Sequence, residues 1–415
     1  MNTRLALSVM LALALAWTST ARARAPLHLE LTLLDAAVQH PDGDGTLTLR
    51  QSVEVTTAVY ELTHFGLAQL ADPRSDDPMA AFIGNLAVSL VDAASVFVSI
   101  PPYSIWLHEE GHRASLARRG IRSTNPTIGP PRLPLLAPLP LTGVTDDEVA
   151  GLLRDSPADF VRVSTVGFEV QYGLNRALAK NAFFHEQPTR SSFIIPMNNL
   201  LVSAYLFQCA NESGIAGDCV LAAGALFDPE GPVADGKDIP ADQQAWLESQ
   251  FLLSLLNFID PFTLDYRGFD LPVSVLGAPV TVSAAPRYVP TSFGYGVGID
   301  GYARAGKLGL MVSPMVFANG VAAFPALGAE LVSLPMEHLI LSGRVEVWAQ
   351  PEDQHFDSAI WQPGGSAELR VAGHLFEKRL HPFVELGAKS AGWARGTAFL
   401  EGAFIVRGGL SAELF

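Results

Sequence analysis

The sequence predicts an α+β protein, with a mainly helical part over residues 26–270 followed by an antiparallel β-barrel of about eight strands over residues 271–415. Before residue 270, apolar residues cluster in long runs with helical spacing. After it, short segments alternate between apolar and polar residues, and glycine is frequent. The 415 residues, 49% of them hydrophobic, are enough for two domains that each bury a core.

The first 25 residues have the pattern of a secretory signal peptide. Arg4 supplies a positive charge, residues 5–17 form an apolar stretch, and residues 21–23 or 23–25, both Ala-Arg-Ala, offer a cleavage site. The alternative is an uncleaved membrane anchor, for which the apolar stretch falls short of the roughly 20 residues that a span needs. We therefore expect the protein to be exported.

Charge and cysteine content narrow the class of protein further. Asp and Glu number 42 against 27 Lys and Arg, and no basic run is long enough to follow a phosphate backbone. We therefore expect no nucleic-acid partner. Cys209 and Cys219 are the only cysteines, and no further Cys or His lies near them to complete a zinc site. In an oxidising compartment we expect them to form one local disulfide.

Two long apolar runs lie in the helical part, at residues 79–105 and 245–258. Periodicity does not distinguish a buried helix of a globular domain from a membrane span. Asp92 and the pair Pro101-Pro102 interrupt the first run and favour burial in protein. A protein held in the inner membrane by these runs is the alternative.

The part after residue 270 has a period of two. Leu369 and Val371, for example, alternate with Glu368 and Arg370. The pattern fits a soluble sandwich or barrel with its apolar face inward, or a transmembrane barrel with that face outward. The region resembles the small outer-membrane barrels, which often end in Phe behind an alternating strand, as Phe415 does here. The resemblance implies an outer-membrane location.

Residues 103–120 read as one helix that carries a metal-binding pattern. Pro101 and Pro102 precede it, and Gly120 ends it. His108 and His112 are four residues apart, so both imidazoles project from one face and can hold a single Zn²⁺. Glu109 is placed to take a proton from metal-bound water and pass it to a leaving amine.

This run, His108-Glu109-Glu110-Gly111-His112, resembles the zinc-dependent metallopeptidases with an H-E-x-x-H helix. With its Gly111, it looks most like the H-E-x-G-H helix of the site-two proteases. The resemblance covers about twenty residues and implies peptidase activity and zinc. It transfers roles only to the two histidines, as zinc ligands, and to Glu109, as the catalytic base.

A catalytic zinc site needs a third protein ligand. We expect Glu169 to supply it, from a helical segment at residues 159–182; the arrangement resembles the gluzincin-type peptidases, whose third ligand is a Glu on a later helix. The site-two resemblance points instead to Asp260 or Asp265. His185 is a further alternative. The proline-rich stretch at residues 124–141 is expected either to line the cleft or to be a surface linker.

The sequence therefore predicts a zinc endopeptidase of the bacterial cell envelope that acts on a protein or peptide substrate. Its catalytic domain would face the periplasm, and its β-domain would fix it in the outer membrane. One alternative is an inner-membrane protease that cleaves membrane-embedded substrates. Another is a non-enzymatic outer-membrane barrel with a helical periplasmic binding domain, in which the His-Glu helix is coincidental.

Overall fold

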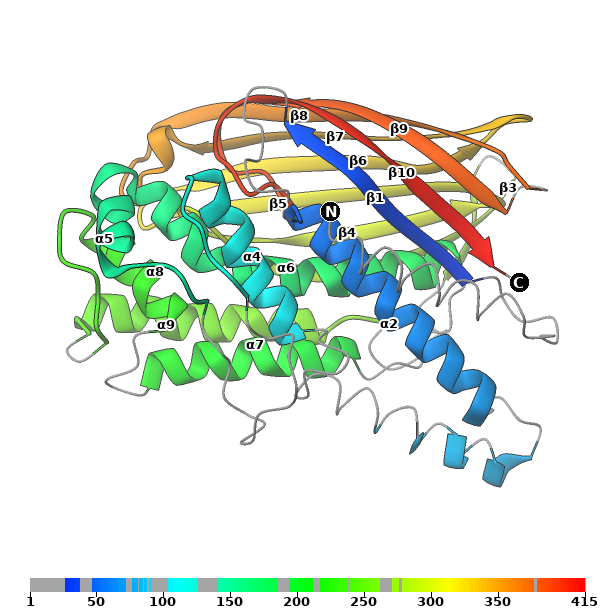
Figure 1. Ribbon diagram of the computed structural model, residues 1–415, viewed down its shortest axis with the longest axis horizontal. Helices are drawn as coiled ribbons and strands as arrows, with labels where there is room; N and C mark the ends of the chain where they lie inside the picture. The colour runs from blue at the N-terminus through cyan, green and yellow to red at the C-terminus, as the bar shows by residue number, and fades with distance from the viewer. Residues whose placement is uncertain are drawn as a thin grey trace.

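A computed structural model describes residues 27–37, 47–71, 77–80, 82–84, 86, 87, 90, 104–125, 141–185, 194–211, 217–236, 239–261, 271–275, 278–376 and 379–414. They form a broad antiparallel sheet with a group of helices packed against one of its faces (Figure 1). Several expectations lie outside the described residues: the signal peptide over residues 1–25, Asp265, most of the run 79–105, and residues 126–140 of the proline-rich stretch.

The helical layer is organised around α6 (Pro157–Phe184), which contacts strand β3 and five other helices. Pro157 lies in its first turn, where a missing N–H costs little. None of the described helices is both long enough and apolar enough to cross a membrane. The other helices are α2 (Leu49–Ala71), α4 (Ser104–Arg118), α5 (Asp146–Asp155), α7 (Ile194–Asn211), α8 (Asp218–Phe227) and α9 (Ala241–Ser254), followed by the 3-10 turn η2 (Leu255–Phe258).

The sheet has ten strands in the order β1-β10-β9-β8-β7-β6-β5-β4-β3-β2. All strands from β2 to β10 pair with their neighbours in sequence, as an antiparallel meander. A short 3-10 turn, η4 (Glu352–Gln354), follows β7. The strands are β1 (Leu27–Ala37), β2 (Leu271–Val275), β3 (Ala278–Thr291), β4 (Gly294–Ala305), β5 (Leu308–Ala318), β6 (Ala323–Pro335), β7 (Leu339–Pro351), β8 (Trp361–Gly373), β9 (Leu380–Lys389) and β10 (Ala403–Leu414).

The sheet is open, which corrects the expected closed barrel of about eight strands. β1, from the part expected to be helical, adds to the far edge by pairing with β10, and β2 forms the other edge. Helix α2 packs beside β1, where Leu27 and Leu29 share an apolar cluster with Ala58 and Phe65. The coarser expectation of helices followed by an antiparallel sheet is confirmed.

The two faces of the sheet have opposite polarity. Every exposed residue in strands β3 to β10 is alanine, proline or a larger apolar residue. Charged side chains of the same strands point toward the helices and form ion pairs there. Arg344 Nη2 lies 3.0 Å from Glu368 Oε1, and Arg176 of α6 reaches Asp300 of β4 at 3.1 Å. The charged face is thus covered by helices, and the apolar face is exposed.

Candidate metal centre

The helix expected at residues 103–120 forms as α4 and is buried along most of its length. Two glycines allow α4 and α6 to approach closely. A Cβ on Gly111 would lie 3.0 Å from Val170 Cγ2, and a Cβ on Gly167 would lie only 2.5 Å from His108 Cε1. A side chain at residue 167 would therefore displace the His108 ring.

The two histidines of α4 converge on one carboxylate. Nε2 of His108 lies 3.0 Å from Asp218 Oδ2, and Nε2 of His112 lies 3.3 Å from the same oxygen. Asp218 is the first residue of α8, which packs against α6. Together the three residues form a group whose donor atoms could hold one metal ion.

The opposite nitrogens of both rings are bound by protein acceptors. His112 Nδ1 donates to the backbone oxygen of Val163 at 2.6 Å. His108 Nδ1 lies 2.9 Å from Gln171 Oε1, and the Gln171 amide is oriented by its own Nε2, which donates to Ser104 Oγ at 2.7 Å. Because Nδ1 of each ring faces its own acceptor, Nε2 is the nitrogen directed at Asp218, and it offers a lone pair to a metal once its proton is released. His112 Nε2 is buried without a hydrogen-bond partner among the described residues.

This arrangement fits Zn²⁺. In a tetrahedral site with bonds of about 2.0–2.1 Å, neighbouring ligand atoms lie roughly 3.3 Å apart. The separations of 3.0 and 3.3 Å between the histidine nitrogens and Asp218 are close to that value. Acceptors that bind the outer N–H of ligand histidines are also a regular feature of zinc sites. Two imidazoles and one carboxylate would leave the fourth position for water.

The electrostatics of the group favour a positive charge between the ligands. Burial disfavours a charged His112, but the Asp218 carboxylate, together with Glu109 and the Val163 carbonyl, outweighs it and raises the pKa of His112 to about 9. Burial would raise the pKa of Asp218, yet the two histidines hold that pKa well below its usual range. An ionised carboxylate therefore faces two imidazoles in a buried setting.

Glu109 lies in the same buried region, next to the first ligand on α4. Burial raises the pKa of its carboxyl group, while His112 and His108 act in the opposite direction. The backbone of Leu141 hydrogen-bonds the Glu109 carboxylate. At the other end of the proline-rich stretch, Asn125 donates to Glu110 Oε1 at 3.1 Å. Both described ends of that stretch therefore contact the helix that carries the site.

Glu169, expected as the third ligand, does not join this group. One of its oxygens pairs with Arg162 at 2.6 Å, and the other accepts the Gly396 N–H at 2.8 Å. The reason is helical geometry. Gly167 and Gln171, four residues apart on α6, face His108, and residue 169 lies midway between them on the opposite side of the helix. Asp218 takes the place expected for Glu169.

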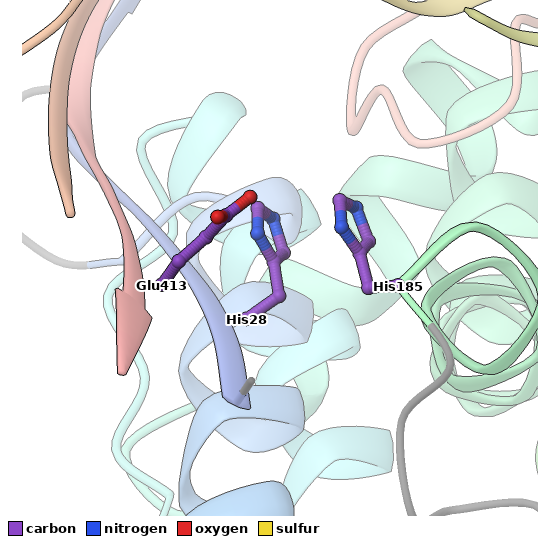
Figure 2. A group of neighbouring side chains, drawn as sticks. All are labelled: His28, His185 and Glu413. Atoms are coloured by element: carbon purple, nitrogen blue, oxygen red, sulfur yellow. The ribbon is translucent and has the colours of Figure 1, made fainter. Parts of the chain in front are cut away.

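The alternative ligands lie elsewhere as well. Asp260 forms a buried ion pair with Arg287 of β3, beneath the sheet. His185, directly after α6, belongs to a second group with His28 of β1 and Glu413 of β10, whose donor atoms also lie near one another. Figure 2 shows Glu413 beside His28, with the His185 ring on the other side of His28.

The second group suits a metal less well than the first. The rings of His28 and His185 stack in parallel, with centroids 3.7 Å apart and 3° between their planes. Nitrogen lone pairs lie in the ring plane, so the lone pairs of two stacked rings run side by side and do not converge. The rings of His108 and His112 instead meet at 74°. We therefore assign the candidate metal centre to His108, His112 and Asp218.

Sequence reasoning singled out His108, His112 and Glu109 as candidate site residues, but missed Asp218 and Gln171. The sequence signal for Asp218 is its neighbour Cys219. A carboxylate at the start of a helix, next to a disulfide-bonded cysteine, is held in a defined position and is therefore a candidate ligand. Gln171 follows Gly167 by four residues on a segment expected to be helical. A polar residue and a glycine on one helix face indicate a neighbour that approaches closely and needs a hydrogen bond.

No protein-family model matches the chain, and neither a curated protein nor a solved structure matches it. The chemistry open to the centre is set by its own donor atoms and their distances.

Proposed function

We propose that the protein is a zinc-dependent endopeptidase, with His108, His112 and Asp218 as ligands and Glu109 as the general base. One observation carries the proposal: both Nε2 atoms converge on Asp218 Oδ2 while both Nδ1 atoms are bound by other acceptors. A simple charged helix face would not orient two rings in this way. Peptide hydrolysis is the activity implied by the resemblance of the helix to zinc metallopeptidases.

The residues of the site would have separate roles in peptide hydrolysis. Bound zinc would polarise the substrate carbonyl and lower the pKa of a water molecule to about 7. A carboxylate oxygen of Glu109 would accept a proton from the water as its oxygen bonds to the substrate carbonyl carbon, and would deliver that proton to the amide nitrogen as the C–N bond breaks. Burial, which raises the pKa of Glu109, makes its carboxylate a stronger base for the first transfer. Gln171 and Val163 keep the histidine rings in place throughout.

The test is a Glu109→Gln variant of the full chain, with zinc content and cleavage of a denatured protein measured on the same preparation. We expect one zinc per chain in both proteins and loss of cleavage in the variant. Glu110→Gln is the matched control, because Glu110 binds Arg113 and Asn125 and not the metal ligands. It should keep cleavage. Wild-type protein that binds no zinc would overturn the proposal.

We further propose that the exposed face of the sheet contacts the hydrocarbon of a membrane, in keeping with the envelope location expected from the sequence. Large aliphatic side chains on adjacent strands support this. Exposure of so wide an apolar surface to water is unfavourable. Soluble monomers rarely expose a contiguous apolar patch of more than a few hundred Å². The exposed residues include Leu310, Val312, Val316, Leu327, Val345, Val347, Leu369, Val371, Val384, Leu386 and Phe404.

The position of the charged side chains, on the other face of the sheet, also supports contact with lipid. Buried ion pairs such as Arg407 with Glu385 lie on the face toward the helices. In a protein surrounded by water, the usual arrangement is apolar toward the core and charged toward solvent. The reversed arrangement is the one that a lipid environment requires. Partition of the protein into lipid vesicles, without detergent, tests this.

We expect the wild type to float with vesicles of phosphatidylcholine and phosphatidylglycerol. The double variant Val347→Asp/Leu369→Asp should remain largely in the aqueous fraction, because a charged side chain on the lipid face of a sheet is destabilising in hydrocarbon. Ala241→Asp/Ala245→Asp adds two charges to the exposed side of α9 and serves as control. A wild type that stays soluble and monomeric beside the vesicles would contradict lipid contact.

A further inference from the structure

The third ligand of the proposed centre is attached to α7 at two neighbouring points. The Asp218 N–H donates to the Tyr205 hydroxyl at 3.2 Å, and that hydroxyl lies 3.4 Å from Asp218 Oδ2. The next residue, Cys219, is bonded to Cys209, so the expected disulfide is present. Tyr205 and Cys209 lie four residues apart on α7 and therefore on the same face, one turn from each other.

The disulfide is buried, and Tyr205 is partly buried against the same apolar cluster. Cys209 and Cys219 belong to an apolar cluster that also contains Leu206 and Leu247. At the residue before Asp218, a Cβ on Gly217 would lie 2.6 Å from the Tyr205 hydroxyl. Only glycine at this position allows Tyr205 to reach the Asp218 backbone. The position of Asp218 is thus defined by contacts that do not involve a metal.

The centre needs such contacts because its ligands come from separate elements. His108 and His112 are held together by one turn of α4, whereas Asp218 begins a different helix. The geometry of α4 therefore does not fix the position of Asp218. The disulfide closes a loop over a sequence separation of 10, which restricts the positions open to Asp218. A ligand that is already in place binds metal at a lower entropic cost.

We infer that Tyr205 and the Cys209–Cys219 disulfide are positioning groups for the metal ligand Asp218, so that metal affinity depends on the redox state of this disulfide. The inference rests on the proposed metal centre. A dithiol reductant would transfer two electrons and two protons to the Cys209 and Cys219 sulfurs, giving two thiols, and would itself become a disulfide. The released α8 N-terminus would then carry Asp218 away from the two histidines for part of the time.

The test measures Zn²⁺ affinity by competition with a chromophoric chelator, at a temperature well below unfolding. The proteins are the full-length wild type, Cys209→Ser/Cys219→Ser and Tyr205→Phe. Serine replaces the disulfide so that no thiol reagent competes for the metal. We expect affinity to fall roughly 10- to 100-fold in the double variant and about 10-fold in Tyr205→Phe, the range seen for groups that orient ligands.

Leu247→Ala is the matched control. Leu247 is fully buried in the same apolar cluster, on α9, and touches no ligand. It should lower the unfolding temperature and leave zinc affinity unchanged, which separates positioning from general stability. Zinc binding of normal affinity in both test variants would overturn the positioning role alone. A wild type that binds no zinc would instead overturn the metal centre, and the inference with it.

Discussion

Two clusters in this protein contain the same donors, two histidines and one carboxylate, in different arrangements. In the α4 cluster the rings meet at 74° with centroids 4.7 Å apart, and both aim a nitrogen at Asp218. In the cluster of His28, His185 and Glu413, the imidazoles stack in parallel (Figure 2). The comparison teaches that donor type and proximity do not suffice. The direction of the lone pairs decides whether a metal fits.

The charge around the two clusters differs as well. Asp218 raises the pKa of His112 to about 9, against the effect of burial. For His185, burial and the neighbouring His28 and Lys180 lower the pKa well below its usual value. One cluster therefore favours a cation between its members, and the other favours neutral rings packed on each other.

The largest expected effect comes from removing a ligand. His112→Ala should lower zinc affinity by more than about a hundredfold, beyond the loss caused by changing an outer-shell partner. His185→Ala should leave zinc content unchanged. Metal analysis after equilibrium dialysis measures both. Zinc lost from His185→Ala but kept by His112→Ala would reverse the assignment of the two clusters.

The identity of the third ligand gives the next effect. Asp218→Asn keeps the size of the side chain but removes its charge, so zinc affinity should fall at least tenfold. Glu169→Gln should not change the affinity, although loss of the buried pair with Arg162 should lower stability by about 3 kcal/mol. Zinc competition and urea unfolding on each variant separate these outcomes. Equal zinc affinity for Asp218→Asn and wild type would remove Asp218 from the site.

A smaller effect is expected at the contact between α4 and α6. Gly167→Ala should weaken zinc binding by about tenfold, because the new methyl group forces the His108 ring out of position. Gly173 lies six residues further along α6, and a Cβ there would meet only Val53 Cγ2, at 3.6 Å, so Gly173→Ala is the control. It should bind zinc normally. If the two variants behave alike, the position of the His108 ring does not limit affinity.

The smallest effect concerns pH and the stacked cluster. The pKa of His185 is lowered in the folded protein, so the unfolded chain binds its proton more tightly. His185 should therefore contribute a loss of stability as pH decreases below about 6.5, of at most roughly 1.4 kcal/mol per pH unit. Burial also lowers the pKa of the stacked His28, to about 4, so that residue acts in the same direction. Urea unfolding between pH 7.5 and about 5 measures the slope. His185→Gln should reduce the slope without abolishing it, and an unchanged slope would show that the pKa of His185 is the same in the folded and unfolded chain.

The candidate site was predictable where it is local in sequence. His108, Glu109 and His112 lie within two turns of one helix, and helical periodicity alone sets their relation. For Asp218 the local signal was only a carboxylate beside a half-cystine, because its approach to the histidines depends on packing of α8 against α6, between distant segments. The expected ligand Glu169 lies on α6, which packs against α4, but on the face turned away from His108, since the side facing α4 is set by Gly167 and Gln171.

In the sheet, too, local features could be predicted from the sequence and long-range features could not. Alternation identifies the strands after residue 270, and it assigns Leu369 and Glu368 to opposite faces. It does not reveal which face the helices cover, nor that the sheet stays open. Both depend on long-range pairing, in which β1 adds to β10 and α2 packs beside that edge. The sheet is open because β1 and β2 form its two edges and do not pair with each other.

The pairing of β1 with β10 has a consequence for the order of assembly. Leu27 pairs with Leu414, so β1 can pair in the sheet only after β10, the last strand, has been synthesised. Such a contact of long sequence separation forms slowly. During synthesis α4 and α6 can associate long before β1 is placed. The candidate metal centre would then exist ahead of the completed sheet, and a maturing chain could acquire its metal before its final strand has joined.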